Sequence, residues 1–127
     1  MQAFLLVGAG GAIGAMARYG VSSVVGRLWP SAFPFATLLV NVAGSLAMGL
    51  LIGWLARVLP PWQDEARLFI AVGVLGGFTT FSAFSLDTIT LIERGAVAQA
   101  ALYVLLSVAL SVLGLYLGLL ITRGFPA

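Results

Sequence analysis

Two phenylalanines three positions apart, Phe81 and Phe84, alternate with the serines Ser82 and Ser85. Residues three apart lie on one face of a helix, so the two rings share a face and the hydroxyls flank it. An aromatic ring has a negative face and a positive edge, and ring edges can therefore approach a small anion in a dry site. The pattern predicts an anion site, with plain core packing of the two rings as the open alternative.

The segment directly before the rings is poor material for an uninterrupted helix: it reads Gly76-Gly77-Phe78-Thr79-Thr80. Adjacent glycines cost about 1 kcal/mol each relative to alanine in a helix interior, and threonine hydroxyls compete for backbone hydrogen bonds. A break would free N–H groups that attract anions. It would also free carbonyls, such as those of Gly76 and Thr79, that can ligate a small hard cation. We therefore expect a broken helix here.

Polar side chains recur in two other apolar segments. Asn41 follows Thr37 by one helical turn, and Tyr103, Ser107 and Ser111 recur every four residues on an uncharged stretch. Taken singly, such a hydroxyl is more often an interhelical hydrogen bond. Amide and hydroxyl donors on three segments, with no acid among them, indicate a path for a negative species.

Arg18 and Asp87 are ionisable residues inside apolar stretches. Such a residue is a functional hypothesis by default, although snorkelling and ion pairing near a span end also explain one. Arg18 would raise the local anion concentration at a pore mouth. For Asp87 we favour a structural role, because an acid in an anion path would repel the substrate.

Composition places these residues in a membrane. The chain is 61% hydrophobic and 8% charged, with a mean hydropathy of +1.14, whereas soluble domains are about a quarter charged. It contains neither cysteine nor histidine, which excludes thiol chemistry and His-based catalysis and makes an enzyme improbable. The six arginines are too scattered to indicate nucleic-acid binding.

Four charge-poor stretches each approach the roughly 20 residues that cross a bilayer. They run over about 3–25, 35–55, 68–92 and 97–121. We therefore predict an all-α integral membrane protein, one domain over residues 1–127, with the third span broken near its middle.

Arginine is distributed almost evenly over the two sides that such spans define. One side carries Arg57, Arg67 and Arg123, and the other carries Arg27 and Arg94, with Arg18 if it snorkels there. This gives almost no positive-inside bias. The distribution predicts insertion in both orientations and an antiparallel homodimer, the inverted symmetry that larger transporters build into one chain.

Three stretches carry a family resemblance: GAIGAMARY over 11–19, TLLVNVAGS over 37–45 and GGFTTFSAFS over 76–85. They resemble the signature blocks of the CrcB/Fluc fluoride channel family, in the same four-span order. The family often has Thr between the two phenylalanines and Glu after the last serine, where this chain has Ala83 and Asp87.

The resemblance implies a dual-topology antiparallel homodimer in the bacterial inner membrane, with two pores for passive, fluoride-selective export. It implies a central structural sodium ion on the backbone carbonyls of Gly76 and Thr79 from both copies. Arg18 would line an aqueous vestibule. The implied fluoride pore residues are Thr37, Asn41, Phe81, Ser82, Phe84, Ser85, Tyr103, Ser107 and Ser111.

Two alternatives remain. A proton-coupled exporter resembling the small multidrug resistance proteins needs an acid deep in a span, but the first span has none and Asp87 follows the expected break. A structural subunit of a larger membrane complex would not explain the polar residues that recur with Phe81 and Phe84.

Overall fold

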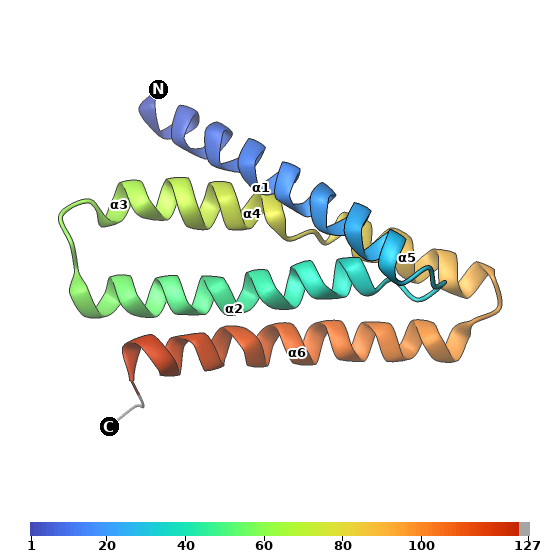
Figure 1. Ribbon diagram of the computed structural model, residues 1–127. Helices are drawn as coiled ribbons and strands as arrows, with labels where there is room; N and C mark the ends of the chain where they lie inside the picture. The colour runs from blue at the N-terminus through green and yellow to red at the C-terminus, as the bar shows by residue number, and fades with distance from the viewer. Residues whose placement is uncertain (125–127) are drawn as a thin grey trace.

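The computed structural model describes residues 1–124, and those residues form an all-helical fold (Figure 1). The end of the predicted 1–127 domain, residues 125–127, lies outside the described part. The helices are α1 (Gln2–Leu28), α2 (Phe35–Val58), α3 (Gln63–Ala66), the π-helix η1 (Arg67–Leu75), α4 (Gly76–Phe78), α5 (Ser82–Glu93) and α6 (Val97–Arg123).

Four helical stretches are long and apolar enough to cross a membrane, with α3 through α5 joined as the third. Their lengths are 27, 24, 31 and 27 residues. At about 1.5 Å per residue each exceeds the hydrocarbon core of about 30 Å, so the helix ends reach the headgroup region. The prediction of an all-α protein with four spans is confirmed. The antiparallel dimer stays a prediction, since the structure describes one chain.

Glycines let the helices approach backbone to backbone. Helices α2 and α6 run side by side in the same direction (Figure 1). A Cβ on Gly118 would lie 2.6 Å from the carbonyl oxygen of Leu46, and one on Gly49 would clash with the carbonyl of Leu115. In lipid no hydrophobic effect drives helices together, and close packing at small residues with this spacing drives their association instead.

The glycine pair expected to break the third span is helical. Gly76 has φ −62° and ψ −38°, and the chain leaves the helix only at Thr79, with φ −85° and ψ 159°. A Cβ on Gly77 would lie 2.6 Å from the carbonyl oxygen of Gly11, so this glycine serves the contact with α1. The interruption covers residues 79–81, so it overlaps only the end of the stretch 76–80 that was expected to break the helix, and α5 begins at Ser82.

A small core forms where α5 meets α6. It consists of Phe84, Leu91, Ala100 and Tyr103, and Tyr103 is fully buried. This core fixes α5, and with it the residues that follow the interruption, against the polar face of α6.

Candidate ion-conduction site

An open cavity of about 490 Å³ lies between α2, the interruption of the third span, and α6. Several residues singled out from the sequence line it together: Asn41, Gly76, Thr79, Phe81, Phe84, Ser107 and Ser111. Ser45 and Thr80 also line it. Residues from four separate elements thus converge on one polar space.

Ser107 and Ser111 present unpartnered hydroxyls. Both Oγ atoms are buried and have no hydrogen-bond partner among residues 1–124, and the whole Ser107 residue is only 6% exposed. An unsatisfied buried hydroxyl costs about 1–3 kcal/mol. Such a group is kept in a protein interior where something else supplies the missing partner.

The two phenylalanines differ in their surroundings. Phe81 is 77% exposed and Phe84 is buried, and their ring centroids are 5.4 Å apart at an interplanar angle of 46°. Phe84 also packs against Tyr103 at 5.1 Å. Both residues line the cavity, and the edge of an aromatic ring carries the positive end of its quadrupole.

Asn41 makes two hydrogen bonds to the backbone of the interruption. Its Nδ2 donates to the carbonyl oxygen of Thr80 at 2.9 Å, and the Thr80 N–H donates to its Oδ1 at 2.7 Å. Gly44 lies one turn further along α2, and a Cβ there would clash with the Thr79 methyl, so its small size lets the interrupted segment reach α2. A primary amide has two N–H donors, so one N–H of Asn41 is left for a ligand.

The remaining predicted hydroxyls lie outside the cavity wall. The Ser85 Oγ donates to the Phe81 carbonyl at 3.0 Å, and the Ser82 Oγ lies 3.4 Å from the Thr80 Oγ1. Thr37 is half-buried one turn before Asn41. The geometry therefore assigns Ser85 a local bond and leaves Ser82 and Thr37 at the margin of the site.

Asp87 has a defined partner. The Tyr103 hydroxyl donates to its Oδ2 at 3.0 Å. Sequence reasoning left this pair unrecognised, although Asp87 lies three residues after Phe84 and thus on the same helix face, toward Tyr103. The bond agrees with the structural role favoured for this acid.

Arg18 reaches the third span. Its Nε donates to the carbonyl oxygen of Gly77 at 3.1 Å, and its side chain is partly buried between α1 and the end of α4. A cation at a helix C-terminus is favourable because the unpaired carbonyls there carry partial negative charge. Arg18 therefore closes the end of α4, and its role in a vestibule stays a prediction.

The carbonyls of Gly76 and Thr79 suit a small hard cation. Both residues line the cavity, and no N–H group within residues 1–124 donates to either carbonyl. The same part of the chain holds no cluster of acids or histidines that could bind a metal. Neutral carbonyl oxygens are hard ligands, so this donor set fits the sodium ion that the family resemblance implies, with further ligands required from elsewhere.

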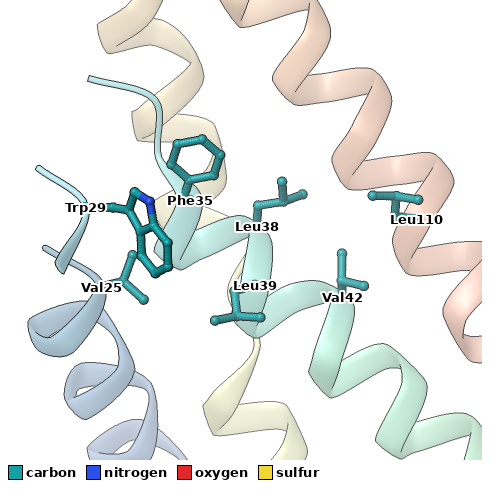
Figure 2. A pocket seen from close by; sticks show the side chains of 7 residues that line it. All are labelled: Val25, Trp29, Phe35, Leu38, Leu39, Val42 and Leu110. Carbon is teal, nitrogen blue, oxygen red and sulfur yellow. The ribbon is translucent and has the colours of Figure 1, made fainter. Parts of the chain in front are cut away.

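A second cavity, of about 510 Å³, is an apolar groove between the end of α1 and the start of α2 (Figure 2). It is lined by Val25, Trp29, Phe35, Leu38, Leu39, Val42 and Leu110. These side chains offer almost no donors, so the groove does not suit an ion.

Four helices long and apolar enough to cross a membrane, with a partly polar cavity between α2, the third span and α6, indicate a small multi-pass membrane protein. The chain belongs to the CrcB family: the family model described as "CrcB-like protein, Camphor Resistance (CrcB)" matches residues 5–119. The resemblance seen in the three sequence blocks is thereby confirmed.

Curated relatives match over almost the full length. A protein of Hyphomonas neptunium is 54% identical over 97% of both chains, and one of Roseobacter denitrificans is 52% identical over 98% of both. A third, from Rhodopseudomonas palustris, is 53% identical over 94% of this chain and 96% of its own. Each is named "Fluoride-specific ion channel FluC". The chain is thus a multi-pass protein of the bacterial inner membrane, in a family of transport proteins rather than enzymes.

Proposed function

We propose that this protein is a passive, fluoride-selective ion channel that lets fluoride leave the cytoplasm. The observation that carries the proposal is the pair of buried, unpartnered hydroxyls of Ser107 and Ser111 in the cavity that Phe81 and Phe84 also line. The names of the relatives support fluoride as the ion.

Fluoride suits these groups. Hydrogen bonds to a charged acceptor are shorter and stronger than neutral ones. A small bound anion would therefore offset the free-energy cost of leaving each hydroxyl without a protein partner. Serines four residues apart on α6 are about 6 Å apart along its axis, which gives Tyr103, Ser107 and Ser111 the spacing of successive steps. The ring edges and the remaining N–H of Asn41 complete the shell.

The cavity also supports a dimer. Its wall includes asparagine, serine and threonine residues at the middle of a span, and polar groups are not tolerated facing hydrocarbon. A second copy laid across the same face would cover them, and Phe81, exposed here, would insert between the two chains. With the balanced arginines, this favours an antiparallel homodimer in which each copy contributes one pore.

A sodium ion on the dimer axis would take the free carbonyls of Gly76 and Thr79 from each copy. Its positive charge would attract the carbonyl oxygens of both copies and so hold the two backbone segments together. The ion is structural in this proposal and does not move with fluoride.

The deciding experiment measures ion efflux from liposomes that contain only the purified protein. Fluoride release without a proton gradient, with chloride retained, is the expected result. Release that requires a proton gradient would favour the exporter alternative, and no fluoride release at all would end the channel proposal. A control with empty liposomes gives the leak of HF across the lipid.

A further inference from the structure

We infer that Thr80 is a positioning residue for the proposed cation site, because its hydroxyl captures the amide that would otherwise satisfy the Thr79 carbonyl. The inference rests on the proposed sodium site and explains which side chains create it. It starts from the hydrogen bonds that the interruption in the third span does and does not make.

In a continuous α-helix each N–H donates to the carbonyl four residues earlier. The Thr80 N–H would thus donate to Gly76, and the Ala83 N–H to Thr79. In the structure the Thr80 N–H donates instead to Asn41 Oδ1 at 2.7 Å. The Ala83 N–H donates to the Thr80 Oγ1 at 3.1 Å.

Both diversions release a carbonyl that lines the cavity. Gly76 and Thr79 are left without a donor within residues 1–124, and both lie on the cavity wall. Among the neighbouring carbonyls, Leu75 accepts from the Thr79 N–H and hydroxyl and Gly77 accepts from Arg18, whereas Phe78, like Gly76 and Thr79, has no donor within residues 1–124.

The two capturing groups differ in how cleanly they can be tested. Asn41 bonds both polar atoms of the Thr80 backbone and lines the proposed pore, so changing it alters conduction and cation site together. The Thr80 hydroxyl accepts the N–H of Ala83 three residues later, the same kind of bond that an N-cap side chain makes. Its removal frees the Ala83 N–H and lets Thr79, extended here with ψ 159°, return to a helical conformation in which its carbonyl accepts that N–H in place of the cation.

The test compares Thr80→Val and Thr80→Ala, which lack the acceptor, with Thr80→Ser, which keeps it. Thr90→Val is the matched control, because the Thr90 hydroxyl only donates to the carbonyl of Leu86, at 2.8 Å. Unfolding temperature of the full-length protein in detergent is measured against sodium concentration, with N-methylglucamine holding the ionic strength constant. The readout is the sodium concentration that gives half of the stabilisation.

A competing hydrogen bond changes an equilibrium by a factor of roughly two to ten, and two copies each contribute one. We expect the half-maximal sodium concentration to rise about tenfold in Thr80→Val and Thr80→Ala and to stay near wild type in Thr80→Ser and Thr90→Val. If the Thr80 hydroxyl only stabilised the start of α5, its loss would lower the unfolding temperature equally at every sodium concentration. This result would distinguish a purely structural role from a role in cation binding.

An unchanged half-maximal sodium concentration in both acceptor-less variants overturns the inference, as does a wild-type protein that sodium does not stabilise. If Thr80→Val does not fold, Thr80→Ala carries the comparison, and Thr80→Asn, which again offers an acceptor, should restore the wild-type value. Fluoride efflux of the wild type separates the two levels: normal efflux with no sodium effect refutes only this inference, and a sodium effect without efflux refutes only the channel.

Discussion

Replacing Ser107 by alanine should make the protein more stable and a worse channel at once. The Ser107 Oγ is buried without a partner in the described chain, so wild type carries an unsatisfied hydroxyl that costs about 1–3 kcal/mol. Alanine removes that oxygen and leaves only a small gap. We therefore expect the free energy of unfolding to rise by about 1 kcal/mol, the low end of that range.

Conduction should move the other way. A hydrogen bond to a charged group contributes about 1.5–3 kcal/mol, and a passing fluoride would lose one such bond in Ser107→Ala. An energy of about 1.4 kcal/mol corresponds to a factor of ten in an equilibrium constant. We expect fluoride efflux to fall roughly tenfold or more.

The assay pairs unfolding in mixed micelles with fluoride efflux from liposomes made from the same preparation. Ser85→Ala is the matched comparison for stability, because the Ser85 hydroxyl donates to the Phe81 carbonyl and its loss removes a satisfied bond worth about 1 kcal/mol or less. A Ser107→Ala protein that is less stable than wild type and conducts normally would show that the hydroxyl has a hidden protein partner and that the reasoning about orphan donors is wrong.

Three further outcomes are expected. Asn41→Asp should abolish fluoride efflux, because a carboxylate repels the anion and sets an acceptor against the backbone carbonyl that the amide now binds. A double-mutant cycle of Tyr103→Phe and Asp87→Asn, read by unfolding, should give a coupling of about 1.5–3 kcal/mol, the value of a hydrogen bond to a charged group. Gly77→Ala should destabilise the fold by about 1–3 kcal/mol through overpacking, whereas Gly8→Ala, with open space around it, should not.

Each of these outcomes has a clear opposite. Wild-type efflux from Asn41→Asp would place the ion path elsewhere. Additive effects of the two changes in the cycle would mean that the Tyr103 bond to Asp87 contributes nothing to folding. Equal stability of the two alanine variants would mean that α1 and the third span can separate without cost.

The sequence predicted the elements because length and hydropathy alone decide whether a helix can span a membrane. It also singled out half of the residues in the cavity wall, since Asn41, Phe84 and Ser107 are each a polar or aromatic exception in an apolar stretch. Periodicity alone placed Ser107 and Ser111 on one face of α6, and both line the cavity.

The position of the interruption was not predictable from local propensity. Gly76 and Gly77 are poor helix formers, yet both remain helical, and Gly77 packs closely against α1. The helix ends at Thr79, since Asn41, 39 positions away along the chain from Thr80, takes over the next amide. A contact of that sequence separation leaves no local signal.

The same limit applies to the charged residues. Arg18 was expected to face water, and its bond to Gly77 crosses 59 positions of sequence. The bond between Tyr103 and Asp87 joins two spans. Such pairs follow from how the helices pack, which propensity and periodicity describe only in outline.

The π-helix η1 has a consequence for how this span tolerates change in length. Nine consecutive residues, Arg67–Leu75, hold the wider hydrogen-bonding pattern, which is rare and accommodates additional residues in a helix. Removing one residue here would shorten the span only slightly but would rotate everything before it by roughly a quarter of a turn about the axis. Gly73, which contacts Gly10 of α1, lies inside this stretch. Within this stretch a deletion therefore acts as a rotation, and the number of residues before Gly76 sets the angle at which the span meets α1.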